Sequence, residues 1–200
     1  MEAATMMEVF TKSIADYHLT DHVDTELKNP YSAGSIEALF YTKNWIDTVQ
    51  WHLEDIIRDP NIEPNAALAI KRRIDKSNQN RTDLVEQIDE EMLSAYSDVN
   101  PKENARLNTE SPGWAIDRLS ILALKIYHMQ VEANRTNIDS DLQDKNARKL
   151  AILNIQKEDL TLAINQLLDD LASGARIAKV YRQMKMYNDP ELNPVLYKKD

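Results

Sequence analysis

The chain has 200 residues, a formal net charge of −9 and no cysteine. The lack of cysteine excludes disulfides, thiolate metal sites and cysteine nucleophiles, and the acidic balance argues against a nucleic-acid partner, because phosphate backbones are bound by clustered lysines and arginines. Only three glycines, together with abundant helix-forming residues, predict an all-α fold.

This length is sufficient for one α-helical domain with its own core, which we expect to span residues 1–200. No apolar run approaches the length that crosses a membrane. The N-terminus also lacks the basic segment and apolar stretch of a secretory signal. We therefore expect a soluble cytoplasmic protein without a membrane partner.

Local start and stop signals predict four long helices. Ser35 is a suitable N-cap, Pro64 and Pro112 can each occupy a first helical turn, and Gly174 has the position of a C-terminal cap. The predicted helices cover about 35–58, 64–95, 111–134 and 140–174.

Shorter elements are predicted at both ends of the chain. An apolar repeat at helical spacing predicts an N-terminal helix that ends near His18. Residues 175–187 have the composition of a last short helix, and Pro190 and Pro194 predict an extended tail over 188–200.

The helices predicted over 64–95 and 140–174 repeat their apolar residues every three or four positions, as expected for an antiparallel helical bundle. Short loops before each of them predict that each packs against the helix preceding it. Matches such as Asp83-Leu84 with Asp159-Leu160 favour a duplicated helical hairpin.

Residues 44–59 have the densest chemistry in the chain, with two tryptophans, a histidine and several acids. A helical wheel places Asp47, Trp51, Glu54 and Arg58 opposite the apolar face. Trp51 therefore needs a cover, from another helix, a second subunit or a ligand. The apolar face that we expect to pack inward consists of Ile46, Val49, Leu53, Ile56 and Ile57.

His52, Glu54 and Asp55 are the candidate catalytic residues of this segment, as groups that could transfer a proton. His52 and Asp55 are three positions apart, so one helix could offer both as metal ligands, with Asp59 nearby. Such pairs are common in acidic helices, and a histidine beside an apolar face more often bonds to a carboxylate. The sequence predicts no metal site and no particular cofactor, since the remaining histidines add no further spacing: His18, His22 and His128.

A polar layer interrupts the packing face of the 64–95 helix at Arg81, with Asn78 one turn earlier. A buried guanidinium needs a carboxylate partner or an anionic ligand. Two interpretations stay open, an internal ion pair that fixes the helix register and a ligand pocket. The available carboxylates are those of Asp47, Glu54, Asp55 and Asp117.

The helix that begins Ser111-Pro112-Gly113 is nearly apolar all round over 119–124, so we expect it to be strongly buried. Gly113 in its first turn would let another backbone or an anion approach the free amide groups, and Arg118 could join them. Proline and glycine at this place are also an ordinary helix start.

Acids at helical spacing in 83–90 resemble the magnesium ligands of all-α nucleoside triphosphate pyrophosphohydrolases, with Glu54 and Asp55 as the second pair. The doubled glutamate that begins such motifs is absent. The acids are Asp83, Glu86, Asp89 and Glu90. Because Asp83, Glu86 and Glu90 lie away from the packing face of the helix, a solvated face is the preferred interpretation.

Three segments in this order, 51–59, 78–83 and 111–122, resemble the bacterial family named domain of unknown function 4254. The resemblance covers most of the chain. It implies a bacterial cytoplasmic protein associated with genes for cell-surface polysaccharides, and it carries over no catalytic residue.

Two classes of function follow from these features. The first is a module or enzyme that acts on a small anionic ligand, such as a nucleotide or sugar phosphate, through the candidate binding residues Trp51, Asn78, Arg81, Asp117 and Arg118. The second is a helical interaction protein, including a homo-oligomer formed through helical faces. A pocket lined jointly by 44–59 and 78–83 would favour the first, whereas internally paired side chains and an external apolar patch would favour the second.

Overall fold

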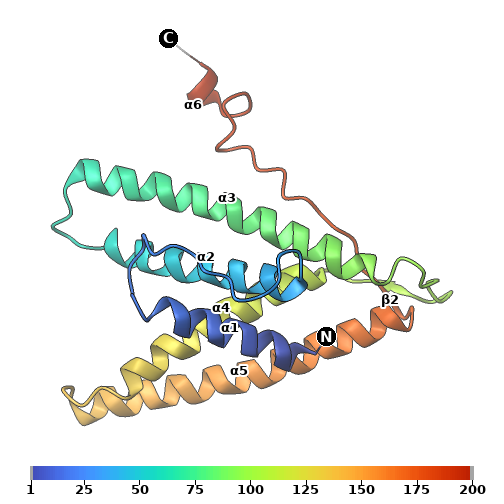
Figure 1. Ribbon diagram of the computed structural model, residues 1–200, viewed down its shortest axis with the longest axis horizontal. Coiled ribbons are helices and arrows are strands. Elements are labelled where there is room, and N and C mark those ends of the chain that lie inside the picture. The colour runs from blue at the N-terminus through green and yellow to red at the C-terminus, as the bar shows by residue number, and fades with distance from the viewer. Residues whose placement is uncertain (1, 199–200) are drawn as a thin grey trace.

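The computed structural model describes residues 2–198 and confirms an all-α architecture (Figure 1). None of the helices in this part of the chain has an apolar stretch long enough to cross a bilayer. The elements are α1 (Ala3–Tyr17), α2 (Ile36–Ile56), α3 (Pro64–Ser94), β1 (Arg106–Leu107), α4 (Pro112–Ala133), α5 (Ser140–Ala172), β2 (Arg176–Ile177) and α6 (Pro194–Tyr197).

The four long helices form two antiparallel hairpins, α2 with α3 and α4 with α5. α4 packs against α2, α3 and α5, whereas α3 and α5 do not contact each other along the described chain. Residues Leu119 and Leu122 to Leu124 of α4 are buried, as predicted. α4 therefore joins the two hairpins, because it packs against α5 within its own hairpin and against both helices of the other hairpin.

The predicted helix boundaries have direct physical causes. Ser35 caps α2 by accepting a hydrogen bond from the Ala38 N–H (3.2 Å). α3 begins at Pro64, and the Glu63 carboxylate accepts hydrogen bonds from the next two amide groups. Gly174 follows α5 with a φ of +70°, the left-handed conformation expected of a glycine at this position.

The start of α4 is capped by a carboxylate from α3. Asp89 accepts hydrogen bonds from the Ser111 hydroxyl (2.5 Å) and from the Gly113 N–H (2.6 Å). A Cβ on Gly113 would lie 2.6 Å from the carbonyl oxygen of Val85. Of the two interpretations of Gly113, the structure shows the close approach of a neighbouring helix, and the anion at the free amide group is Asp89.

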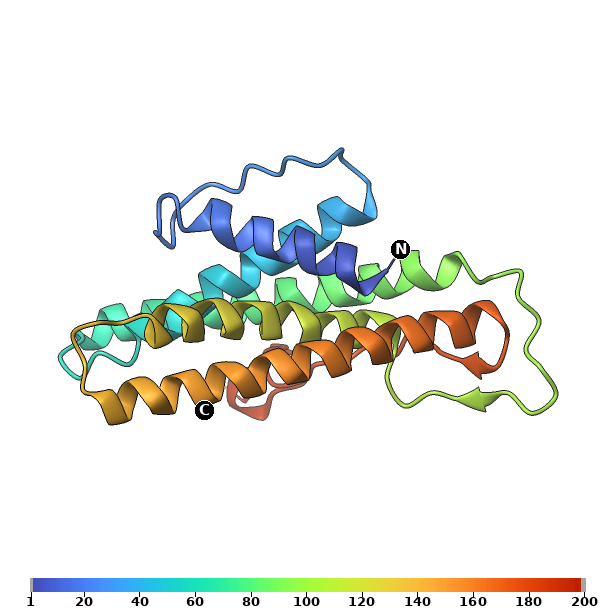
Figure 2. The same cartoon turned by 90° about the horizontal axis from the view of Figure 1, so that it is seen from below.

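α1 contributes several fully buried side chains to the core. Met6, Phe10 and Tyr17 are fully buried, and Phe10 meets Phe40 of α2 edge to face at 6.0 Å. In Figure 2, α1 and the connection that follows it cover one side of the long helices. Much of the core therefore lies between α1, α2 and α4.

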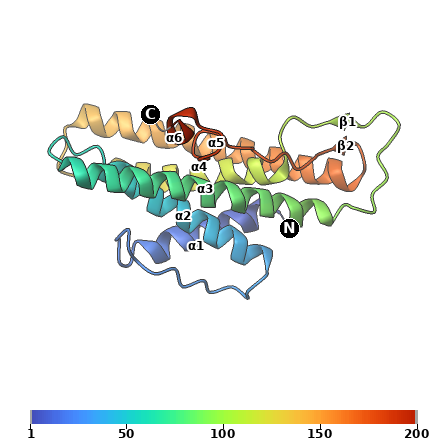
Figure 3. The same ribbon diagram turned by 90° about the horizontal axis from the view of Figure 1, so that it is seen from above.

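The helix predicted over 175–187 is wrong. Residues Arg176 and Ile177 form β2, which pairs in parallel with β1 at the end of the bundle seen in Figure 3. Residues 178–187 then follow α3 without helical structure. Part of the tail predicted over 188–200 forms the single turn of α6, and residues 199–200 lie outside the described residues.

Gly113→Ala tests the close packing between α3 and α4. We expect it to lower the free energy of unfolding by about 1–3 kcal/mol in urea denaturation, because the added methyl group would meet the Val85 carbonyl oxygen and the Asp89 carboxyl group that caps α4. Gln130→Ala, at an exposed position of the same helix, should change it by less than about 0.5 kcal/mol. A stabilised Gly113→Ala protein, as helix propensity alone predicts, would contradict this packing.

Candidate functional site

A buried network of four charged side chains joins α2, α3 and α4. Lys43 Nζ, whose side chain is 0% exposed, lies 2.5 Å from Asp47 Oδ2 and 2.7 Å from Asp117 Oδ1. Arg81 donates to Asp117 from Nε (2.9 Å) and Nη2 (2.6 Å), and its Nε lies 3.2 Å from Asp47 Oδ1. The Ser120 hydroxyl donates to Asp47 (2.7 Å). The internal ion pair, one of the two interpretations of Arg81, is therefore present.

The two carboxyl groups of this network have opposite pKa shifts. Burial raises the pKa of Asp47, and Asp117 adds to the effect, whereas Lys43 and Arg81 oppose it. Burial also disfavours the charged form of Asp117, but Lys43 and Arg81 outweigh it and lower the pKa of Asp117. Asp117 is therefore the stable anion that holds both cations in place.

The prediction that only the apolar face of residues 44–59 packs inward is wrong. The polar side chains of Asn44, Asp47 and Thr48 are buried, whereas Ile56 is 41% exposed. A helical wheel separates polar from apolar residues, but it does not show that a polar side chain has a partner on a neighbouring helix. Asn44, for example, donates to the Ser120 hydroxyl (3.0 Å).

A pocket of about 370 Å³ lies on one side of Arg81 and is lined mainly by residues of α2. Its charged groups include Glu54, which pairs with Arg58 (2.8 Å), and the exposed Asp55. Three carboxylates and two guanidinium groups line this pocket, and both guanidinium groups already contact carboxylates. Residues 44–59 and Arg81 therefore share a pocket, as a ligand site would require, but its charge does not favour an anion.

A second pocket, of about 270 Å³, lies on the other side of Arg81 and has a cationic lining without an acid. Lys185 of the C-terminal segment donates to the Asn78 carbonyl oxygen (2.9 Å) and to the Thr82 hydroxyl (2.6 Å). Burial lowers the pKa of Lys185, with Arg81 adding to the effect and Asp83 opposing it. The complete lining is Asn78, Arg81, Thr82, Trp114, Gln183, Lys185 and Tyr187.

The other predicted site residues lie away from this second pocket. Arg118 pairs with Glu110 (3.0 Å) and lines a separate pocket of about 860 Å³ between α4 and α5. It does not join Arg81. Trp51 is covered by α4, because its ring stacks on His128 at 4.6 Å with an interplanar angle of 3°.

The solvated face predicted for Asp83, Glu86 and Glu90 is wrong at Glu86. Asp89 caps α4, and Glu86 is buried, pairs with Arg182 (2.9 Å) and accepts from the Gln183 N–H (3.0 Å). These acids do not converge with Glu54 and Asp55 into a cluster of three carboxylates within the described residues. Instead of binding magnesium together, Asp89 binds the start of α4 and Glu86 binds the C-terminal segment.

His52 faces away from both pockets that contain Arg81 and meets His18 and His128. Sequence analysis missed this meeting because the three histidines belong to three helices. One signal could have indicated it, since each of them directly follows an aromatic residue, in Tyr17-His18, Trp51-His52 and Tyr127-His128. Lys185 was missed for a different reason, because 175–187 was predicted as a helix.

Comparison with known proteins gives a family without an activity. The family described as "Protein of unknown function (DUF4254)" matches residues 37–180. No curated protein and no solved structure matches the chain. The matched range contains the whole charged network but neither α1 nor Lys185.

Lys43→Met tests the charged network. It leaves two buried carboxylates to share Arg81, so we expect the free energy of unfolding to fall by about 3–5 kcal/mol in urea denaturation. Lys12→Met removes a cation from an exposed ion pair with Asp16 and should cost at most about 1 kcal/mol.

A double-mutant cycle with Asp47→Asn separates charge pairing from packing. Removing one cation and one anion together should cost at least about 1 kcal/mol less than the sum of the two single changes. Strictly additive losses would show that Lys43 and Asp47 do not stabilise each other.

Proposed function

The chain belongs to the family described as protein of unknown function DUF4254, and from the side chains around Arg81 we propose that it binds a small anionic ligand, such as a nucleotide or sugar phosphate. The binding site in this proposal is the pocket between α3, the start of α4 and the C-terminal segment. The protein would act in the bacterial cytoplasm, in keeping with the absence of cysteine.

The observation that carries the proposal is a lysine without a carboxylate partner beside Arg81, which is ion-paired but has one nitrogen, Nη1, without a hydrogen bond in residues 2–198. The lysine is Lys185, which has no carboxylate within 4.0 Å in the same residues. Arg81 remains 24% exposed despite its ion pairs. A phosphate would accept hydrogen bonds from both side chains and would relieve the cost of placing two cations together.

The rest of the lining supports a ligand with a ring. Trp114 and Tyr187 offer flat aromatic surfaces, and Asn78 and Gln183 offer amide groups that can donate and accept. The volume of about 270 Å³ accommodates a phosphate with part of a sugar or base rather than a large cofactor. Asp117 contributes indirectly, by holding Arg81 in place.

The proposal is for binding rather than turnover. His52, Glu54 and Asp55, which we predicted as groups for proton transfer, do not line this pocket. Among the described residues, the lining of this pocket contains no acid and no histidine that could act as a general base near neutral pH.

Thermal unfolding with adenosine monophosphate, glucose 1-phosphate and inorganic phosphate tests the proposal, with uncharged adenosine as a comparison. At a concentration of about 100 times Kd, a ligand should raise Tm by roughly 5–10 °C. Lys185→Ala should weaken binding by about 10- to 100-fold, the loss expected for one charge-assisted hydrogen bond.

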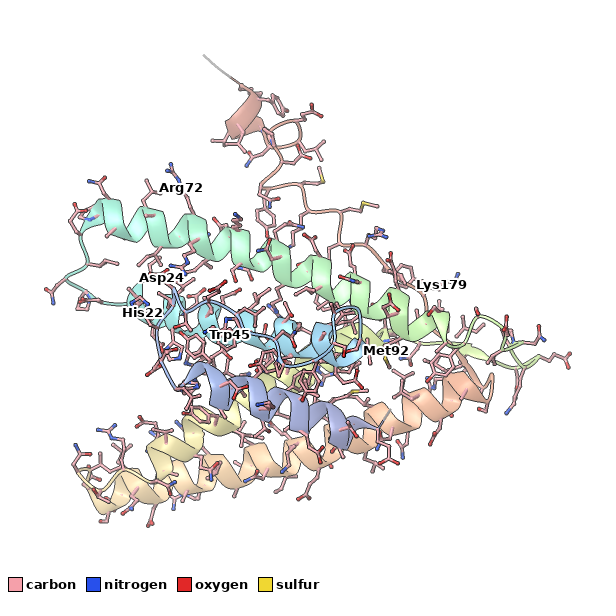
Figure 4. The ribbon with its side chains drawn as sticks, viewed as in Figure 1. His22, Asp24, Trp45, Arg72, Met92 and Lys179 are labelled. Carbon is pink, nitrogen blue, oxygen red and sulfur yellow. The ribbon has the colours of Figure 1, made fainter. Side chains whose placement is uncertain are left out.

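The matched control is Lys179→Ala, which removes the same charge from an exposed position of the same segment, labelled in Figure 4. Binding should be unchanged in that variant. Equal losses in both variants would indicate a general charge effect and would contradict the pocket.

The second candidate function, a helical interaction protein, is favoured by an external apolar surface on the C-terminal segment. Its large exposed side chains are Tyr181, Met184, Met186, Tyr187, Leu192, Val195, Leu196 and Tyr197. Surfaces of this kind on soluble chains commonly mark association sites. No thermal response to any of the compounds, combined with sedimentation as a dimer, would favour self-association over ligand binding.

A further inference from the structure

Three histidines from three helices meet in one place. His18 follows the last residue of α1, His52 lies near the end of α2, and His128 lies in the second half of α4. One ring nitrogen of each lies within 4.8 Å of the other two, and Nε2 of His18 and Nε2 of His52 are 3.3 Å apart.

The three rings are held by aromatic residues in a cyclic arrangement. Each histidine is packed against the aromatic residue that precedes another of the three histidines, so the three dipeptides fix one another. The pairs are Tyr17 with His52 (5.2 Å, 19°), Trp51 with His128 (4.6 Å, 3°) and Tyr127 with His18 (4.2 Å, 36°). Such packing fixes ring orientations before any ligand binds.

The protonation of the rings leaves lone pairs available. His18 Nδ1 lies 2.7 Å from the Ile14 carbonyl oxygen, which can only accept, so Nδ1 has the proton and Nε2 has a lone pair in the neutral ring. His128 Nε2 is buried and has no hydrogen-bond partner among the described residues. An unpaired buried nitrogen is unfavourable unless it has a ligand.

Burial disfavours the charged form of two of the three rings, those of His52 and His128. Burial lowers the pKa of His128 to about 4, with His52 and His18 adding to the effect. Burial also lowers the pKa of His52.

Asp21 adds an oxygen on the solvent side of the cluster. Its Oδ1 lies 3.5 Å from Nε2 of His52 and 4.0 Å from Nε2 of His18. Its φ is +48°, in the left-handed region that aspartate and asparagine adopt more readily than other non-glycine residues.

We propose that His18, His52 and His128 bind a divalent transition-metal ion of the Zn²⁺ class, with Asp21 as a fourth ligand. Three imidazole nitrogens and one carboxylate oxygen form a donor set that Zn²⁺ takes in tetrahedral sites. Two nitrogens bound at about 2.0–2.1 Å in a tetrahedron are separated by roughly 3.3 Å. This is the separation found between the Nε2 atoms of His18 and His52. Mg²⁺ prefers oxygen ligands and does not suit the cluster.

Isothermal titration of the full chain with Zn²⁺, and with Mg²⁺ for comparison, tests the proposal directly. We expect one Zn²⁺ ion per chain, a higher Tm in the presence of Zn²⁺, and no response to Mg²⁺. Wild-type protein that binds no Zn²⁺ would overturn the proposal and would leave His18 and His52 as a hydrogen-bonded pair.

His128→Phe separates a metal ligand from a packing residue. Phenylalanine keeps a flat ring against Trp51 and removes the unpaired nitrogen, so Tm without metal should be unchanged or higher. Zn²⁺ affinity should fall at least about 100-fold, beyond the effect usual for a residue outside the coordination sphere. The matched control is His22→Ala, at a histidine that is 66% exposed near the site, and it should leave Zn²⁺ affinity unchanged.

Wild-type Zn²⁺ affinity in a folded His128→Phe protein, or an equal loss in His22→Ala, would overturn the proposal. Asp21→Asn gives a second measurement if His128→Phe does not fold, because asparagine tolerates the left-handed conformation. Asp21→Asn keeps a neutral amide oxygen in place of the charged carboxylate, so we expect it to weaken Zn²⁺ binding by only about 10- to 100-fold, without lowering Tm. Unchanged affinity in Asp21→Asn would then contradict the site.

Discussion

The structure depends on a buried charge balance. Lys43 and Asp47 of α2, Arg81 of α3 and Asp117 of α4 place two cations and two anions in direct contact. Each charge would be too costly to bury alone, and each is acceptable only when all three helices are in register. The network therefore specifies how the α2–α3 hairpin docks on α4, whereas the apolar contacts around it could tolerate small shifts.

Helix positions could be predicted from the sequence because their causes are local. Ser35, Pro64 and Gly174 act within one helical turn, and the structure places helix ends close to them. Which face of a helix is buried could not be predicted in the same way. Asp47 is buried because Lys43 and Arg81 neutralise it, and Arg81 comes from another helix. Residues 176–177 are extended for a similar reason, because their hydrogen-bond partners lie about 70 residues earlier in the chain.

The candidate sites also differ in how far their residues could be predicted from local sequence. Arg81 stood out in the sequence because a guanidinium on a packing face requires a partner, and Asp117 was one of four carboxylates named for that role. Lys185 had no such signal, since it reaches the pocket only through the extended course of 178–187. The histidine cluster also has no local spacing, and only the repeated order of aromatic residue and histidine in α1, α2 and α4 marks it.

Trp51 lies between the histidine cluster and the pocket beside the charged network. One face of its ring stacks on His128, and the same side chain lines the pocket that contains Asp47 and Arg81. α2 thus has the charged network at Lys43 and Asp47 and the histidine cluster at His52, little more than one helical turn beyond Asp47. Because rigid elements transmit displacements through packed side chains, a change in the orientation of His128 would reach the wall of that pocket through a single aromatic contact.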